Sequence, residues 1–207
     1  MNKIAICVCF TFIVSMASNA LADSIRDRFG VTGRIGFLVP ADSEFNDSSR
    51  SRKSDTDTGF VGGGGFIYGI DKNWAAELDI SHTVFRAHDG FGFEESDFAT
   101  TNISLGAQYR FVNLPVRRLV PYAGAGLDIL VNDFSPVNGS GGDVDSVVGL
   151  HASGGVDYFV LNQLALTGQL KGVLAPDADV RDFRGVRVGN FDPSSLSLTF
   201  GVRYFFN

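Results

Sequence analysis

The sequence predicts an all-β protein, an eight-stranded antiparallel transmembrane β-barrel. Eight segments alternate apolar residues with small or polar ones, which is the pattern of a strand with one apolar face. A short apolar segment at the start of the chain has the form of a secretory signal. The connections between the eight segments alternate between long and short, as they do in barrels that cross an outer membrane.

Residues 1–22 are predicted to be a signal peptide, and residues 23–207 the barrel domain. The segment begins with the basic Lys3, continues with an apolar run and ends in the small residues Ala20-Leu21-Ala22, so that cleavage is expected before Asp23. The apolar run is too short for a helix that spans a bilayer.

The composition of the chain excludes several classes of function. Both cysteines, Cys7 and Cys9, lie in the predicted signal, so we expect no disulfide or thiol chemistry in the mature protein. The formal charge of −6, which becomes more negative when Lys3 is removed, argues against a nucleic-acid partner. Composition alone is also compatible with a soluble β-sandwich.

The first four predicted strands cover residues 29–39, 58–70, 74–84 and 98–111, each long enough to cross a bilayer when tilted. Their apolar faces carry Val31, Ile35, Phe37 and Val39; Phe60, Phe66, Tyr68 and Ile70; Trp74, Ala76, Leu78, Ile80 and Val84; and Ile103, Leu105, Ala107, Tyr109 and Phe111.

The last four strands repeat this pattern. Their apolar faces carry Ala123, Ala125, Leu127, Ile129 and Val131; Val148, Leu150, Val156 and Tyr158; Leu164, Leu166, Leu170 and Leu174; and Leu196, Leu198, Phe200, Val202, Tyr204 and Phe206. In a barrel these faces are predicted to contact lipid.

The connections indicate which way the barrel faces. Long polar segments are predicted at residues 40–57, 88–97, 133–146 and 175–192, and shorter ones at 71–73, 112–119 and 161–163. Long extracellular loops and short periplasmic turns follow if both termini lie in the periplasm.

Aromatic residues are predicted to form a belt at the periplasmic interface, where an amphipathic ring can lie between acyl chains and water. The members of this belt are Tyr68, Trp74, Tyr109, Tyr158 and Tyr204. A soluble sandwich has no reason to place these rings at one height, so the belt favours the barrel.

The side chains on the opposite face are predicted to line the lumen. They include Arg34, Glu77, Asp79, Arg110, Asp128, His151, Asp157, Lys171 and Arg203. Two interpretations are open: a neutral, salt-bridged plug that fills a small barrel, or a narrow lumen whose charges select the solutes that pass. Eight strands leave an interior only just wide enough for side chains or one small ligand.

One short motif suggests catalysis. Outer-membrane lipid A deacylases carry a His-x-Ser pair on the lipid-facing wall, and His151-Ala152-Ser153 has this spacing. The strand pattern directs the pair inward, however, and no carboxylate that would orient the histidine is identifiable outside the wall. We therefore expect no enzymatic activity and predict no catalytic residue, metal site or cofactor.

Three segments of the chain resemble the OmpW-type eight-stranded outer-membrane proteins. The segments are Val120-Pro-Tyr-Ala-Gly-Ala-Gly-Leu127; Gly155-Val-Asp-Tyr158 with the turn Leu161-Asn-Gln163; and Asp192-Pro193 followed by Phe200-Gly-Val-Arg-Tyr-Phe205. The first element is shared with the wider group of small OmpA-like and adhesin-like barrels. The resemblance implies a narrow pore for small, largely hydrophobic solutes, entered from outside and emptied sideways into the bilayer.

Taken together, these features predict a monomeric barrel in the outer membrane of a Gram-negative cell, acting as a passive channel for small, largely hydrophobic molecules. Its expected partners are outer-membrane lipid, small solutes and the outer-membrane assembly machinery. Phe91 and Phe93, in one long loop, could contact an apolar solute. The alternatives are a non-conducting structural or adhesion barrel that acts through its extracellular loops and a lipid A-modifying enzyme.

Overall fold

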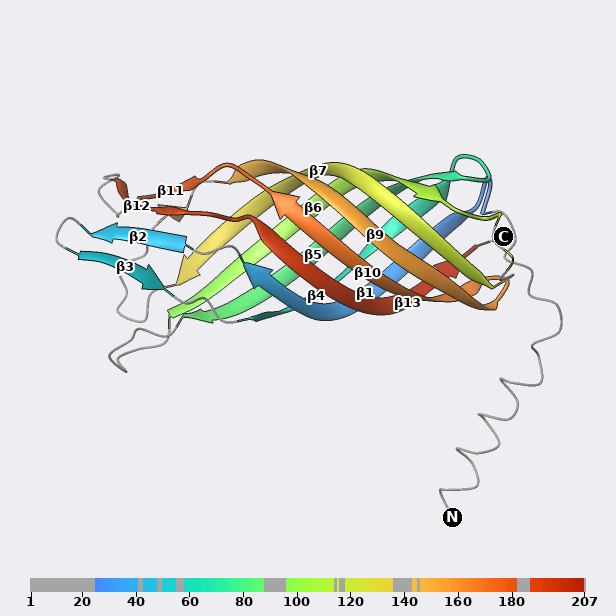
Figure 1. Cartoon of the computed structure of the whole chain (residues 1–207), viewed down its shortest axis with the longest axis horizontal. Coiled ribbons are helices and arrows are strands. Elements are labelled where there is room, and N and C mark those ends of the chain that lie inside the picture. The colour runs from blue at the N-terminus through green and yellow to red at the C-terminus, as the bar shows by residue number, and fades with distance from the viewer. Residues whose placement is uncertain are drawn as a thin grey trace, which may run out of the picture.

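A computed structural model describes residues 25–40, 43–47, 50–54, 58–87, 96–113, 115, 118–135, 143–144, 146–181 and 187–206. Within these residues the chain forms one closed antiparallel barrel, with two small sheets beyond one of its ends (Figure 1). The predicted fold class is therefore confirmed. The predicted signal segment and the loop residues Phe91 and Phe93 lie outside the described part of the chain.

Eight strands make the barrel wall, in the spatial order β1-β13-β10-β9-β7-β6-β5-β4. Their bounds are β1 Phe29–Pro40, β4 Gly59–Gly69, β5 Trp74–Ala87, β6 Ser96–Arg110, β7 Leu119–Ser135, β9 Val147–Leu161, β10 Leu164–Leu174 and β13 Ser195–Phe205.

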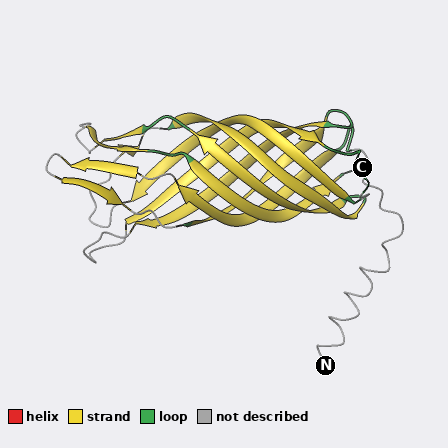
Figure 2. Ribbon diagram, in the orientation of Figure 1, coloured by secondary structure: helices red, strands yellow, loops and turns green. Residues whose placement is uncertain are grey.

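Five short strands lie outside the wall and interrupt segments that the sequence predicts as loops. They are β2 Ser43–Asp47, β3 Arg50–Ser54, β8 Asp143–Val144, β11 Ala178–Arg181 and β12 Arg187–Phe191. Strands β2 and β3 pair as a hairpin, while β12, β11 and β8 form a three-stranded sheet. Figure 2 shows both at the end of the barrel opposite the C-terminus.

The seam between the first and last wall strands closes the barrel. Strands β1 and β13 pair in an unbroken register that runs from Gly30 opposite Phe205 to Pro40 opposite Ser195. Closure gives each of the eight strands a hydrogen-bonded neighbour on both sides, as a bilayer requires.

The outer surface of the wall is apolar. Large side chains such as Ile35, Leu105, Leu150 and Phe200 are more than half exposed, although the hydrophobic effect would bury them in a water-soluble protein. A continuous exposed apolar surface of this kind is stable against lipid. No helix of the described residues is long and apolar enough to cross a membrane.

Candidate functional site in the barrel interior

The interior is closed at the end where the C-terminus lies. Buried apolar side chains pack together there: Ile25, Ile67, Ala75, Val120, Phe159, Ala165 and Phe205. The rings of Phe159 and Phe205 stack with their centroids 5.8 Å apart. Each of these side chains is at most 2% exposed, so the layer is closely packed.

A tight turn just before β1 contributes to the apolar layer. The N–H of Asp27 donates to the carbonyl of Gly69 at 2.7 Å, and the N–H of Arg28 donates to the carbonyl of Ile25 at 3.0 Å. Asp27 has a positive φ of 59°, a conformation that aspartate tolerates better than most residues. The turn directs Ile25 into the barrel, where its side chain is 1% exposed.

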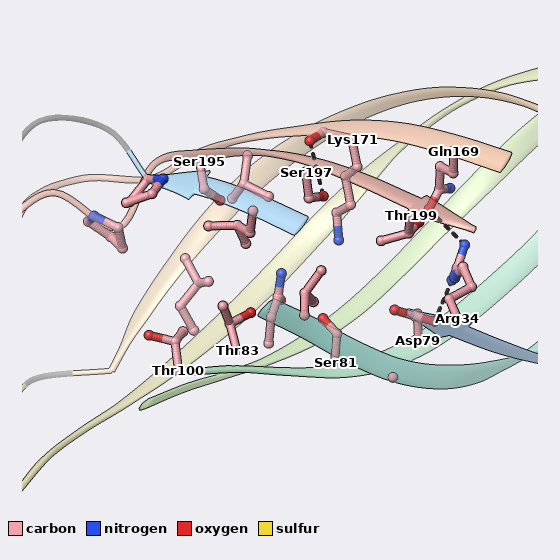
Figure 3. A pocket seen from close by; sticks show the side chains of 18 residues that line it. Arg34, Asp79, Ser81, Thr83, Thr100, Gln169, Lys171, Ser195, Ser197 and Thr199 are labelled. Atoms are coloured by element: carbon pink, nitrogen blue, oxygen red, sulfur yellow. Dashed lines mark hydrogen bonds and ion pairs between the residues drawn. The ribbon is translucent and has the colours of Figure 1, made fainter. Parts of the chain in front are cut away.

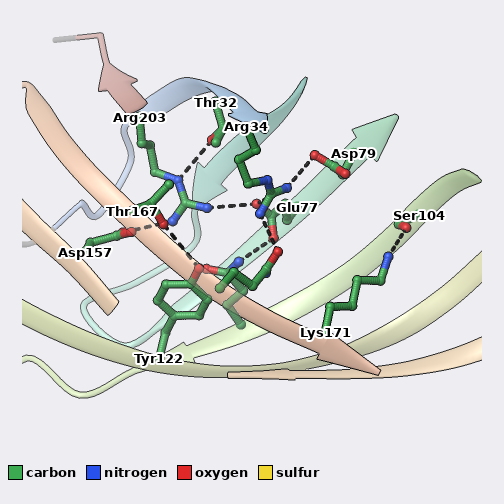
Figure 4. A network of polar contacts seen from close by, with 12 residues as sticks. Thr32, Arg34, Glu77, Asp79, Ser104, Tyr122, Asp157, Thr167, Lys171 and Arg203 are labelled. Atoms are coloured by element: carbon green, nitrogen blue, oxygen red, sulfur yellow. Dashed lines mark hydrogen bonds and ion pairs between the residues drawn. The ribbon is translucent and has the colours of Figure 1, made fainter. Parts of the chain in front are cut away.

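Next to the apolar layer, further from the C-terminal end of the barrel, Arg203 bonds to three side chains of a buried ionic network (Figure 4). Its Nη1 donates to Asp157 Oδ2 and its Nη2 to Glu77 Oε1, both at 2.8 Å, and its Nε donates to Thr32 Oγ1 at 3.0 Å. Arg203 and Asp157 are both 0% exposed. The guanidinium is therefore paired and hydrogen-bonded, as a buried charge must be.

Arg110 joins the same network at the Asp157 oxygen that Arg203 contacts. Its Nη2 lies 2.8 Å from Asp157 Oδ2, and its guanidinium carbon is 5.9 Å from the centroid of the Tyr122 ring. The Nε and Nη1 atoms of Arg110 have no hydrogen-bond partner among the described residues. Asp157 thus bridges two buried arginines.

Arg34 links this network to the middle of the barrel. Its Nη2 donates to Asp79 and lies 3.3 Å from Glu77 Oε1, and its Nη1 donates to Gln169 Oε1 at 2.7 Å. Glu77 also accepts a hydrogen bond from the side-chain amide of Gln108. The arginines of β1 and β13 therefore share one carboxylate from β5.

A second cluster surrounds Asp128 on β7. Lys171 Nζ donates to Asp128 Oδ1 at 2.6 Å and to Ser104 Oγ, while Ser104 in turn donates to Asp128. The other carboxylate oxygen is bonded to His151 Nδ1. Asp128 is 0% exposed, and it is held by hydrogen bonds from three strands.

The predicted lumen residues thus form two contiguous clusters. The four cations Arg34, Arg110, Lys171 and Arg203 are each paired with at least one of the four acids Glu77, Asp79, Asp128 and Asp157. Their formal charges cancel, which limits the desolvation penalty of burying them.

The outer half of the interior is hollow. A cavity of about 740 Å³, counting space open to solvent, reaches from the outer ends of the strands down to a floor made by Arg34, Asp79, Gln169 and Lys171. Figure 3 shows Arg34, Asp79 and Gln169 at the Thr199 end of the row of β13 hydroxyl side chains, and Lys171 beside Ser197. A smaller space of about 310 Å³ shares the same four residues and extends below them to His151, Ser153 and Gln108. We call these four residues the partition, because they line both spaces and lie between them.

The His151-Ala152-Ser153 motif faces the interior. His151 and Ser153 line the smaller space, whereas Ala152 between them is exposed on the outer face. The carboxylate that holds His151 is Asp128, inside the barrel. His151 consequently belongs to the lumen network, Ser153 lines the same space, and only Ala152 of the motif is on the lipid-facing surface.

The predicted belt residues lie where their strands approach the closed end. Tyr68, Trp74, Tyr158 and Tyr204 are exposed on the outer face, and Tyr109 is half-buried. Trp74 and Tyr109 are cross-strand partners, and their rings meet edge to face at 5.2 Å. The interfacial role of the belt stays a prediction.

The candidate lumen residues chosen from the sequence were charged side chains and His151, although the strand alternation places uncharged side chains on the same inward face. Thr32, Ser104, Gln108, Tyr122 and Gln169 are all buried inside the barrel, and most accept or donate hydrogen bonds within the two clusters. Their inward strand positions were a usable signal, because each occupies the same face as the charges of its own strand. No group of three or more candidate metal ligands occurs among the described residues.

Comparison with known proteins gives a consistent result. The family described as "Outer membrane protein beta-barrel domain" has a sequence model that matches residues 8–206. A search of curated proteins finds no match.

Solved structures of similar fold include outer-membrane and surface proteins. The chain is similar to the outer membrane protein OprG from Pseudomonas aeruginosa, with a TM-score of 0.71, 16% identity, and coverage of 90% of this chain and 99% of that one. For Neisserial surface protein A the TM-score is 0.60, the identity 20% and the coverage 86% and 97%. For the outer membrane protein AlkL, determined in lipid bilayers, the TM-score is 0.59 and the identity 16%, with coverage of 88% of this chain and 92% of that one.

Proposed function

The chain belongs to the outer membrane protein β-barrel domain family and lies in the outer membrane, and from this premise we propose that it is a narrow passive channel for small molecules. The resemblance to small eight-stranded outer-membrane barrels, predicted from the sequence, is confirmed by this match. The observation that carries the proposal is the outer cavity, which is open to solvent and reaches to Arg34 and Lys171 in the middle of the wall.

The partition is the first barrier on the proposed route. Arg34, Asp79, Gln169 and Lys171 line the spaces above and below it, so a solute that displaces these side chains enters the smaller space. Further passage toward the periplasm meets Arg203, Asp157 and then the apolar layer, all buried. Conduction therefore requires side-chain movement at the partition and a second opening, through the closed end or through the wall.

Solute uptake into liposomes that contain the refolded protein tests this proposal. We expect uptake above that of empty liposomes, and a faster rate for Arg34→Gln, because glutamine is shorter and cannot pair with Asp79 and Glu77 at once. Thr101→Val is a matched control, since Thr101 is on β6 and bonded to His82 on the outer face. If folded protein gives no uptake with either wild type or Arg34→Gln, the channel proposal is wrong.

A non-conducting barrel is the second candidate, and the closed inner half favours it. The paired charges and the apolar layer fill the lumen in the same way as a structural plug. In that case the extracellular segments would carry the function by binding a partner, and the uptake experiment would give no signal while the protein remained folded.

We assign no catalytic role to the interior. The opposing hypothesis, a lipid A-modifying enzyme, predicts altered lipid A that is lost on His151→Ala or Ser153→Ala. Mass spectrometry of lipid A from cells that express wild type and both variants tests it, and an unchanged lipid A profile in all three is expected.

The proposed setting is a monomer surrounded by outer-membrane lipid, inserted by the assembly machinery of that membrane. The exposed rings of Tyr68, Trp74, Tyr158 and Tyr204 would lie at the periplasmic interface, which is the environment that such rings favour. Fluorescence quenching of Trp74 by lipids brominated at different depths tests this, with the strongest quenching expected near the headgroups.

A further inference from the structure

We propose that the outer cavity is a binding site for a small, uncharged, polyhydroxylated ring. This inference rests on the proposed function, because it names the class of solute that the cavity would admit. It modifies the expectation of a largely hydrophobic solute, and three features of the cavity support it.

The first feature is a pair of hydroxyl-bearing walls on opposite sides of the cavity. Ser195, Ser197 and Thr199 follow one another on the inner face of β13 (Figure 3). Strand β6 is four strands from β13 in either direction around the eight-stranded barrel, which makes it the facing wall. There the amide of Asn102 lines the cavity, and the hydroxyls of Ser81 and Thr83 on the adjacent β5 lie next to it.

Several of these hydroxyls are available to a ligand. The side chains of Ser81, Thr83 and Thr199 have no hydrogen-bond partner among the residues that the structure describes, and all three line the cavity. Ser197 makes only a long contact of 3.4 Å to the carbonyl of Lys171. A hydroxyl can both donate and accept, so these walls can bond to hydroxyls of a solute without a fixed direction.

The second feature is the apolar surface that separates the two hydroxyl walls. On one side it consists of Leu38 on β1 and Val61 on β4, and on the other of Leu130 on β7 and Val173 on β10. Around the barrel the lining therefore alternates between hydroxyl, apolar, hydroxyl and apolar surfaces. A saturated ring whose hydroxyls project from its edge and whose C–H groups cover its two faces is complementary to such a lining.

The third feature is that the charged side chains of the partition, which forms the floor of the cavity, are already paired. Arg34 is paired with Asp79, and Lys171 is paired with Asp128. An ionic solute that left water for this cavity would find no described counter-charge that is not already paired, and desolvation of an uncompensated charge is costly. A purely apolar solute, in turn, would cover the hydroxyl walls without satisfying them.

The test is binding to the refolded full barrel in lipid nanodiscs, followed by NMR titration of amide signals from β13 and β5. The probes are glucose, gluconate as the charged analogue, and cyclohexanol as a ring with a single hydroxyl. We expect glucose to shift signals of residues 195–199 and 81–83 and to bind more tightly than either analogue.

Isosteric variants locate the site. Thr83→Val and Thr199→Val keep the side-chain shape but remove one hydroxyl each, and each is expected to weaken glucose binding about two- to tenfold. Val173→Thr, which places a hydroxyl on an apolar surface, tests the second feature and is expected to weaken binding as well. Thr101→Val makes the same change on the outer face and should leave binding unaltered.

The outcomes separate this inference from the channel proposal. Glucose binding without uptake into liposomes would retain the binding site and refute conduction. Uptake without any preference for glucose over gluconate and cyclohexanol would retain the channel and refute the binding site. Binding that is unaffected by Thr83→Val and Thr199→Val would also overturn the inference.

Discussion

The two halves of the barrel interior have the same wall but different contents. In the inner half, long side chains such as Arg203, Arg110 and Phe205 meet across the barrel axis and fill the space. In the outer half, the inward positions carry Ser, Thr, Asn, Val and Leu, which are too short to meet, and a cavity remains. The lesson is that side-chain length, with strand number unchanged, decides where an eight-stranded barrel is open.

The largest loss of stability is expected in the inner half, on substitution of Asp157, the carboxylate that Arg110 and Arg203 share. Asp157→Asn leaves the buried charges of Arg110 and Arg203 without their shared partner and should destabilise the barrel by about 3–5 kcal/mol. Urea unfolding in lipid vesicles measures the change. The isosteric outer-half variant Thr83→Val is the matched control, and equal losses for the two variants would contradict the division into halves.

A somewhat smaller loss is expected at the apolar layer. Ile25→Ala removes a fully buried side chain and should cost about 2–4 kcal/mol in unfolding free energy. The same variant should accelerate proteolysis within the turn that precedes β1. A loss below that of an exposed outer-face variant such as Ile35→Ala would show that the turn is not part of the closure.

A substitution at the boundary between the two halves is expected to reduce the unfolding free energy less. Lys171→Met leaves the buried carboxylate of Asp128 without its lysine partner, although the bonds to His151 and Ser104 remain, so the expected loss is about 1.5–3 kcal/mol. Because Lys171 is part of the partition, this variant should also change the rate of solute uptake. Stability and uptake are measured on the same preparation, and a loss as large as that of Asp157→Asn would place Lys171 with the inner half.

The smallest effect lies outside the wall, in the turn between β4 and β5. Backbone N–H groups of Trp74 and Asn73 each donate to Asp71 at 2.7 Å, and these bonds hold the pKa of Asp71 below its ordinary value. The stabilisation is thus complete above the ordinary aspartate pKa of about 3.9 and is lost as the pH falls through the lower folded-state value.

Asp71→Asn should therefore be slightly less stable than wild type at neutral pH, with the difference vanishing in acid. Unfolding curves between pH 7 and pH 3 measure it. A difference that grows on acidification would contradict the assignment.

The alternation of the sequence was sufficient to predict the wall. Side chains two residues apart share a face, so the exposed Ile35 and Phe37 and the buried Arg34 of β1 follow from parity alone. The hairpin of β2 and β3 was not predictable in this way, because Ser43–Asp47 and Arg50–Ser54 contain mainly polar residues and carry no apolar alternation.

The partners in the ion pairs could not be predicted from the alternation of residues within single strands. Arg34 reaches Asp79 and Glu77 on a strand that is not its immediate neighbour, and Arg203 reaches Glu77 across 126 residues of sequence. These partners depend on the register and stagger of the closed barrel, which are global properties. The position of the cavity in the outer half was not predicted for the same reason, since the cavity arises from several strands whose small inward residues lie at one level. Whether the lumen residues form a solute path stays a prediction.

The position of Arg203 on β13 also bears on how the barrel assembles. Of the eight wall strands, β13 emerges last from the ribosome, yet it supplies the cation for Asp157 of β9 and Glu77 of β5 and half of the closing seam with β1. Until β13 pairs with its neighbours, Asp157 and Glu77 lack one of their principal counter-charges. The strand that completes the wall therefore also completes the pairing of charges in the lumen.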